Sequence, residues 1–337
     1  MGSYRNLAYF NFNKKLETRY MSSTYNFINI PDQKGDLKTI AELIRITNIG
    51  IEAIMNVYDD HRLDRNTSTK MFPLQENLIY RIFAVFHQYE LLVEGLNNKT
   101  IVDLNKEPYD GILESHPTIY RYSYELSSIV DSIFFHLCSV FDYLGHFISY
   151  MFEANKDKTL DWKSLANKAR AAYKDTLKSA DGIREIDNKI RINLEWHRSQ
   201  LIHRRRDSRR IGITKNQKSN QLSLIFAASA ETMKHFKNIV AGYDKESNYT
   251  LDCLPSVVIY QTLRSINFLL DLLRIDLLSG STFEENVKNP KGNGLPYLLH
   301  PLTKKLQPKS EVIWTDYKRQ LKKFYHNYGQ RKNGAEA

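Results

Sequence analysis

Eleven apolar residues that recur at helical spacing constrain the fold more than any other feature of this chain. They are Leu126, Ile129, Val130, Ile133, Phe134, Leu137, Val140, Phe141, Leu144, Ile148 and Met151. The stripe covers about seven turns of helix. Because an apolar face of this length and width is stable only when other helices cover it, the sequence predicts a helical bundle.

Further helical patterns lie on both sides of this stripe. They run through Ile40–Ile54, Leu78–Leu92, Leu160–Leu177, the stretch from Asp181 to the basic cluster after Trp196, and Pro255–Leu278. Glycine and proline break helices, and the chain has only 14 glycines and 9 prolines among its 337 residues. The scarcity of breakers favours long, uninterrupted helices.

One segment departs from the helical pattern. Ile211–Thr214 and Gln221–Phe226 are short apolar runs separated by a polar stretch, a pattern that predicts a small β-hairpin. The predicted fold class is therefore all-α: a helical bundle with an N-terminal helical extension, a small β-hairpin insertion and a basic C-terminal helix. The prolines and glycine of Asn97–Pro117 suggest a boundary, and we expect three regions, 1–115, 116–282 and 283–337.

The C-terminal segment carries one aromatic face. It consists of Trp314, Tyr317, Leu321, Phe324 and Tyr328, with lysines and arginines mostly outside it. Two interpretations are open: the packed side of a docked helix, which we favour, or a surface on which nucleobases stack.

The positive charge is concentrated in two segments. The chain carries a net charge of +10, residues 196–215 contribute +6 and residues 286–337 contribute +8, so the rest of the chain is mildly acidic. Two basic segments in an otherwise mildly acidic chain indicate a polyanionic partner, and nucleic acid is the first candidate. The alternative interpretation is that these segments only make the protein surface more soluble.

Several features predict a cytoplasmic protein. Both cysteines, Cys138 and Cys253, lie in apolar stretches, as reduced core cysteines do, and the N-terminal twenty residues form no apolar leader. The two most apolar segments, Leu126–Phe152 and Leu254–Leu278, each contain charged residues, so we expect no membrane span.

Most standard catalytic and metal-binding motifs are absent. The sequence contains no phosphate-binding glycine loop, nucleophile elbow, paired CxxC motif or HExxH helix. Asp59-Asp60-His61 could touch a metal ion, but it opens the polar stretch Asp59–Gln75, which we expect to be a solvated loop. No metal or other cofactor is predicted. The remaining candidates for catalytic residues are arginines and histidines.

Four arginines precede a histidine by five to seven residues. The pairs are Arg81/His87, Arg191/His197, Arg198/His203 and Arg319/His326. The surrounding sequence favours Arg198/His203. This pair lies at the end of a predicted amphipathic helix, a small polar residue follows the arginine, and a run of basic residues follows the histidine. His197, from an overlapping pair, remains an alternative.

The segment from Arg198 to His203 resembles the Arg-x4–6-His motif of HEPN-domain proteins. The resemblance covers roughly residues 118–280 and includes the long helix, a second helix, the motif at the end of a third helix and a closing apolar helix. It implies an α-helical bundle that dimerises, with both motif copies at the interface, and a metal-independent ribonuclease activity. Ser199 departs from the family pattern, in which Asn, Asp or His most often follows the arginine, but a serine can still cap a helix or contact phosphate.

The resemblance implies a division of roles between two catalytic residues. His203 would move protons to and from the RNA 2′-hydroxyl and the leaving 5′-oxygen, and Arg198 would hold the phosphate as negative charge develops. Five helical residues place the two side chains about 140° apart, so they meet only if the helix breaks near Ser199 or if a second copy supplies one of them. The RNA-binding residues expected beside them are Arg204, Arg205, Arg206, Arg209 and Arg210.

Two functions are compatible with these residues. We favour an endoribonuclease that acts on single-stranded RNA or tRNA, forms a homodimer and serves as a toxin or antiphage effector, with an antitoxin or regulatory partner. The alternative is a non-catalytic helical module that binds nucleic acid or protein through Arg204–Arg210.

Overall fold

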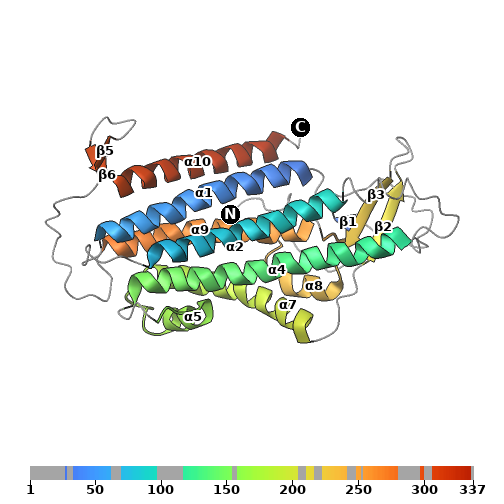
Figure 1. The fold of residues 1–337 in the computed structure, drawn as a ribbon, viewed down its shortest axis with the longest axis horizontal. Helices are drawn as coiled ribbons and strands as arrows, with labels where there is room; N and C mark the ends of the chain where they lie inside the picture. The colour runs from blue at the N-terminus through green and yellow to red at the C-terminus, as the bar shows by residue number, and fades with distance from the viewer. Residues whose placement is uncertain are drawn as a thin grey trace. The chain divides into compact units, whose positions relative to one another are not determined.

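The computed structural model describes the greater part of the chain. The described residues are 27–28, 33–61, 70–96, 117–153, 158–203, 210–215, 222–240, 248–251, 253–279, 297–299 and 306–334. The long helices are α1 (Gln33–His61), α2 (Met71–Glu94), α4 (Pro117–Phe152), α9 (Cys253–Leu278) and α10 (Lys309–Gly334). The fold is all-α, as the sequence predicts (Figure 1).

Shorter elements connect the long helices. The short helices are α5 (Trp162–Arg170), α6 (Ser179–Ile186), α7 (Ile192–His203) and α8 (Ala230–Phe236), and a π-helical turn, Asp187–Arg191, joins α6 to α7. The strands pair two by two: β1 (Phe27–Ile28) with β4 (Asn248–Tyr249), β2 (Arg210–Lys215) with β3 (Leu222–Ala227), and β5 (Tyr297–Leu299) with β6 (Leu306–Pro308). The β2–β3 hairpin, antiparallel from Arg210↔Ala227 to Lys215↔Leu222, confirms the predicted insertion (Figure 1).

The chain divides into two compact units. The first comprises Met1–Ile40, Ala84–Cys138 and Lys189–Gln261, and the second comprises Ala41–Phe83, Ser139–Asn188 and Thr262–Ala337. α1, α2, α4 and α9 each contribute residues to both units. The boundaries predicted at residues 115 and 282 lie outside the described residues.

The second unit has a buried polar network at its centre, where α1, α9 and α10 lie side by side (Figure 1). The amide nitrogen of Asn267 donates to Thr47 Oγ1 at 2.7 Å, and Tyr317 donates its hydroxyl to Asn267 Oδ1 at 2.9 Å. All three residues are buried. Gly50 allows this approach, because a Cβ there would lie 2.7 Å from Tyr317 Cε2. The network therefore fixes the register of three helices.

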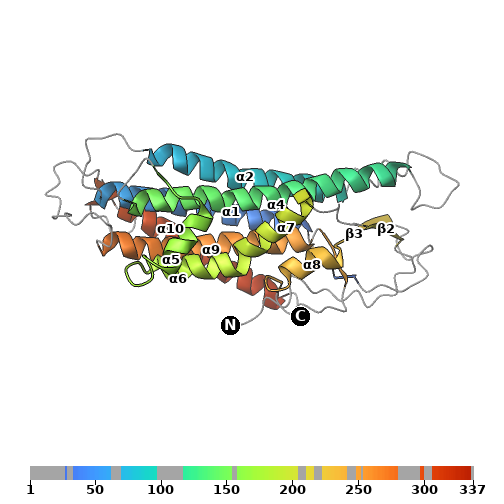
Figure 2. The same ribbon diagram turned by 90° about the horizontal axis from the view of Figure 1, so that it is seen from below.

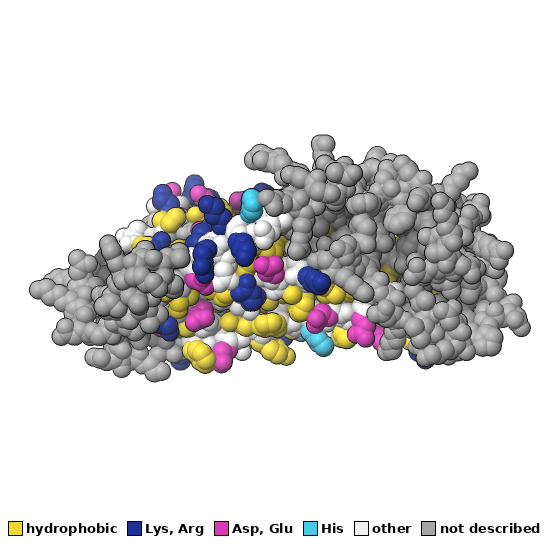
Figure 3. All heavy atoms as spheres, turned by 90° about the horizontal axis from the view of Figure 1, so that it is seen from above, with side chains coloured by type: hydrophobic (Ala, Val, Ile, Leu, Met, Phe, Trp, Pro, Cys, Tyr) yellow, Lys and Arg dark blue, Asp and Glu magenta, His cyan; other side chains and the backbone are white. Residues whose placement is uncertain are grey.

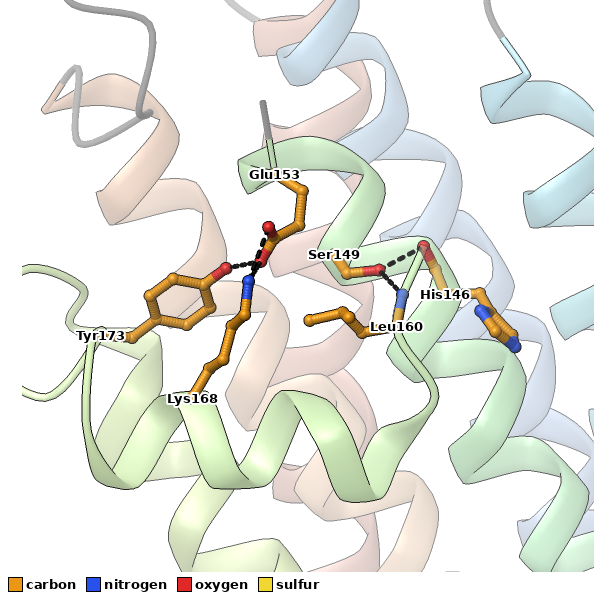
Figure 4. Close-up of polar contacts among 6 residues, drawn as sticks. All are labelled: His146, Ser149, Glu153, Leu160, Lys168 and Tyr173. Carbon is orange, nitrogen blue, oxygen red and sulfur yellow. Dashed lines mark hydrogen bonds and ion pairs between the residues drawn. The ribbon is translucent and has the colours of Figure 1, made fainter. Parts of the chain in front are cut away.

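The end of α4 is fixed against α5 in the same unit. Figure 4 shows Lys168 and Tyr173 both pointing to the carboxylate of Glu153, where Lys168 Nζ lies 2.6 Å from one oxygen and the Tyr173 hydroxyl donates to the same atom. Burial, with a smaller contribution from the Glu153 hydrogen bond, raises the pKa of Tyr173 above its ordinary value. Ser149 accepts a hydrogen bond from the Leu160 backbone nitrogen at 2.8 Å (Figure 4).

Two buried carboxylates hold the short helices of this unit. Asp187 accepts from Trp162 Nε1 at 3.0 Å and pairs with Arg170 at 2.5 Å. Asp276 accepts from the backbone nitrogens of Lys178 and Ser179 at 2.7 and 2.8 Å, and so satisfies donors at the start of α6. Each carboxylate thus links segments that are distant in the sequence.

The first unit has an aromatic core. Phe134 from α4 stacks on Phe236 from α8, with ring centroids 4.9 Å apart, and His197 from α7 contacts both rings. α7 and α8 lie next to each other in Figure 2. The imidazole of His235 and the side-chain oxygen of Gln200 are 2.8 Å apart and connect the two helices.

Three predictions about individual segments can be compared with the structure. The aromatic face of α10 is packed, since Trp314, Tyr317 and Phe324 are all buried, and this confirms the interpretation that we favoured. The loop expected at Asp59–Gln75 is wrong at both ends, because α1 continues to His61 and α2 begins at Met71. The helix expected over Leu160–Leu177 is shorter and ends at Arg170.

One helix meets the length and hydropathy criteria for a membrane span within the described residues. It is Ile119–Phe152, and half of its most apolar window is buried inside the protein. Buried core helices of soluble proteins meet the same criteria, so this is weak support for a span. Cys138 on this helix is buried.

Candidate functional site

The predicted catalytic residues lie on one helix of the first unit. Arg198 and His203 both belong to α7, which continues through Ser199 without a break and ends at His203. On a regular helix the two positions lie about 140° apart around the axis. From the sequence, the two side chains could meet if the helix broke near Ser199 or if a second copy of the chain supplied one of them. The structure shows no helix break near Ser199. Within one copy, the two positions therefore lie on different sides of α7.

Arg198 is the described member of the pair. Its side chain is 38% exposed, its guanidinium carbon lies 5.9 Å from the centre of the Phe135 ring, and its Nη1 is 3.8 Å from Glu195 Oε2. That separation is an ion pair but exceeds hydrogen-bond length. Arg198 forms no hydrogen bond with a described residue, so its N–H groups are available to an external acceptor. Phe135 and Glu195 orient the guanidinium without occupying its donors.

Glu195 also faces a second arginine. Arg191 Nη2 lies 3.8 Å from the same carboxylate oxygen that faces Arg198, so one acidic side chain stands between two basic ones. The stretch from Arg191, at the end of the π-helical turn, to Arg198 of α7 therefore carries more positive than negative charge, which favours the binding of a phosphate.

His197, the alternative histidine, occupies a different environment. It is only 2% exposed, and its ring centroid lies 4.8 Å from that of Phe134, 5.3 Å from that of Phe236 and 5.8 Å from that of His235. An RNA strand cannot reach a ring enclosed in this way. The position of His197 favours a role in packing.

The remaining predicted residues are only partly described. Ser199 is exposed on α7. The side chain of His203 and all of Arg204, Arg205, Arg206 and Arg209 lie outside the described residues, and Arg210 is the first residue of β2. The structure thus places Arg198 and Ser199 on accessible parts of α7.

Sequence reasoning missed Trp196 as a site residue. Its side chain is 59% exposed, two residues before Arg198 and seven before His203. A signal was present, because Trp196 is out of phase with the apolar positions Ile190 and Leu194, both buried. An exposed indole beside a basic segment is a surface on which a nucleobase can stack.

Comparison with known proteins gives no further guide to this site. No protein-family model, no curated protein and no solved structure matches the chain. Within the described part of the chain, no group of three or more His, Cys, Asp and Glu side chains is arranged to hold a metal ion. α7 and its neighbours are therefore the features of the protein that indicate a function.

Proposed function

We propose that the protein is an endoribonuclease of the HEPN type that cleaves RNA by attack of the 2′-hydroxyl group. The observation that carries the proposal is the state of Arg198: partly exposed, oriented by Glu195 and Phe135, and without a hydrogen bond to a described residue. It stands five residues before the histidine that ends α7.

The chemistry needs one cation and one proton carrier. A guanidinium offers several N–H donors in one plane and stays charged at every physiological pH, so Arg198 would bind the scissile phosphate and stabilise the charge of the transition state. An ordinary histidine titrates near neutrality, so His203 would accept the proton of the 2′-hydroxyl or donate one to the leaving 5′-oxygen. The products are a 2′,3′-cyclic phosphate and a 5′-hydroxyl, and the reaction uses no metal ion.

The site is assembled from two chains in this proposal. Because α7 is regular, Arg198 of one copy would act with His203 of the other across a twofold interface. We infer a cytoplasmic homodimer that cuts single-stranded RNA or tRNA as a toxin or antiphage effector, controlled by an antitoxin or regulatory partner. Arg204–Arg210 would bind the flanking phosphates.

The test is cleavage of single-stranded RNA and of tRNA in the presence of EDTA. We expect the wild-type protein to cleave, Arg198→Ala and His203→Ala to lose cleavage, and all three proteins to show the same helical circular dichroism. Arg121→Ala and His87→Ala are matched controls, since both residues are exposed and lie outside α7. Cleavage that survives in both α7 variants, or that requires a divalent metal, would overturn the proposal.

A non-catalytic function is the second candidate. The observation that favours it is the separation of Arg198 from His203 around a regular helix within one copy. A module that binds RNA through the basic segment needs no such meeting. RNA binding without cleavage by the wild-type protein or any variant would support it.

A further inference from the structure

The outer face of α10 carries a second basic surface. Arg319, Lys322, Lys323 and His326 occupy positions i, i+3, i+4 and i+7 of the helix and are all exposed. Residues with this spacing share one side of a helix. In Figure 3, lysine and arginine side chains gather over α10.

Most of the charge on this face is not neutralised. On the side of α10 that meets α9, Lys318 binds both carboxylate oxygens of Asp271, at 2.6 and 2.8 Å, and Glu311 pairs with Arg274. On the outer side, Lys322 and Lys323 form no ion pair with a described residue. Arg319 pairs with Asp316 three residues earlier, in an exposed position where such pairs are weak.

A neighbouring helix extends the surface. Arg45 of α1 is exposed and donates from Nη1 to Gln320 Oε1 at 2.6 Å, so a neutral partner holds its guanidinium beside α10. We define the α10 basic surface as Arg45, Arg319, Lys322, Lys323 and His326. It belongs entirely to the second unit, whereas Arg198 belongs to the first.

The geometry points to an RNA phosphate backbone as the ligand of the α10 basic surface. Trp314, Tyr317 and Phe324 are buried and Tyr325 is only partly exposed, so none of the described aromatic rings of α10 is fully exposed for a base to stack on. A helix that enters a membrane surface needs an exposed apolar face, and that face of α10 is buried. Charge without stacking or base-edge contacts gives affinity that is independent of sequence and sensitive to salt.

This inference rests on the proposed function for the choice of RNA as the polyanion. The α10 basic surface would hold RNA through residues outside the cleavage site and raise affinity without taking part in chemistry. Its residues are therefore binding residues, and their loss should alter the affinity and leave the cleavage rate at saturating RNA unchanged.

The experiment measures binding of fluorescein-labelled oligouridylate by anisotropy across a salt series. The whole 337-residue chain carries His203→Ala to prevent cleavage. We expect Lys322→Glu with Lys323→Glu to weaken binding by roughly tenfold, and the slope of log K against log salt to fall by about 1.4, which is the loss of two single-strand phosphate contacts. The matched control is Lys163→Glu with Lys174→Glu, exposed lysines at or just after α5 that change the net charge equally.

Each outcome of this experiment decides the inference. Equal weakening by both double variants would mean that net charge alone acts, and no weakening by either would mean that RNA does not touch α10; both overturn the inference. Binding to phosphatidylserine vesicles that Lys322→Glu with Lys323→Glu abolishes, with RNA binding intact, would assign the surface to membranes instead. If RNA binding depends on α10 but wild-type protein never cleaves, the inference stands and the proposed nuclease function fails.

Discussion

Two histidines on α7 differ in what a substitution should reveal. His197 is enclosed by Phe134, Phe236 and His235. Truncation to alanine removes ring contacts and leaves a cavity, so we expect His197→Ala to lower the free energy of unfolding by about 3 kcal/mol. His197→Phe should restore part of this loss. Denaturant unfolding followed by circular dichroism measures both changes.

The proposed catalytic histidine should behave in the opposite way. We expect His203→Ala to lose cleavage and to keep the unfolding midpoint of the wild-type protein. An unfolding free energy lowered as far as that of His197→Ala would identify His203 as a packing residue and remove it from the site.

The tyrosine at the centre of the second unit offers a test of the buried network. Tyr317→Phe removes the hydroxyl that donates to Asn267 Oδ1 and leaves a buried amide oxygen without that donor. We expect unfolding to become easier by about 1–2 kcal/mol. Tyr325→Phe, on the same helix but only partly buried, is the comparison, and an equal loss would show that the network adds nothing.

At the level of elements, the sequence predicts the long helices because their apolar stripes repeat over many turns. The stripe from Leu126 to Met151 became α4, and the aromatic face of α10 proved to be its packed side. Local composition failed where a polar segment belongs to a helix: Asp59 and Asp60 look like a loop, yet α1 carries them to His61. Helix propensity is a weak signal at these two positions, and tertiary packing determines whether the helix continues.

The candidate site was predictable in type but not in geometry. The spacing of Arg198 and His203 is visible in the sequence, whereas the continuity of α7 and the roles of Glu195 and Phe135 are not. The ring environment of His197 also needs contacts from α4 and α8, which no local pattern specifies. Contacts between residues far apart in the chain account for what sequence reasoning missed.

The crossing of α4 and α5 depends on a glycine. A Cβ at Gly145 would lie 2.5 Å from the backbone nitrogen of Trp162, and neither backbone can move aside cheaply. We expect Gly145→Ala to destabilise the fold by about 1–3 kcal/mol or more, as overpacking does, despite the better helix propensity of alanine. Thermal or denaturant unfolding checks this.

Gly182 in α6 is the control for that substitution. The nearest atom to a Cβ there is Leu272 Cδ1 at 2.8 Å, the end of a side chain that can rotate. We expect Gly182→Ala to change stability much less, because the gain in helix propensity, about 1 kcal/mol, offsets the adjustment of the leucine. A larger loss for Gly182→Ala than for Gly145→Ala would contradict this account of the crossing.

For the whole molecule, buried and partly buried tyrosines predict a stability that is sensitive to alkaline pH. Burial raises the pKa of Tyr325 to about 12, against a lowering effect of Arg264, and burial also raises the pKa of Tyr173 and of Tyr317. A tyrosine in the unfolded chain ionises near pH 10. Between about pH 10 and 12 the unfolded state therefore binds fewer protons than the folded state, and stability falls as pH rises. Below pH 10 this contribution is fully present.

A denaturant series from pH 9 to 12 tests the sign of this effect, with tyrosinate absorbance as the direct readout. We expect the loss of stability across that window to be smaller in Tyr325→Phe than in the wild-type protein. Stability that rises with pH over the same range, or a tyrosinate titration complete near pH 10 in the folded protein, would show that these phenols are not protected.

The proposed assembly of a cleavage site from two copies gives the sharpest prediction for the whole molecule. Arg198→Ala and His203→Ala should each be inactive as purified dimers. Random exchange of subunits in an equal mixture makes half of the dimers heterodimers, each with one intact pair, so about a quarter of wild-type cleavage should return.

Light scattering verifies the dimer, and Arg198→Ala mixed with the Arg198→Ala/His203→Ala double variant is the control that should stay inactive. Two results would contradict assembly from two copies: a mixture that regains no activity although its subunits exchange, and a wild-type protein that cleaves as a monomer. Either result would mean that Arg198 and His203 of one chain act on the same phosphate. The regular helix α7 could not explain that, because it places the two residues about 140° apart.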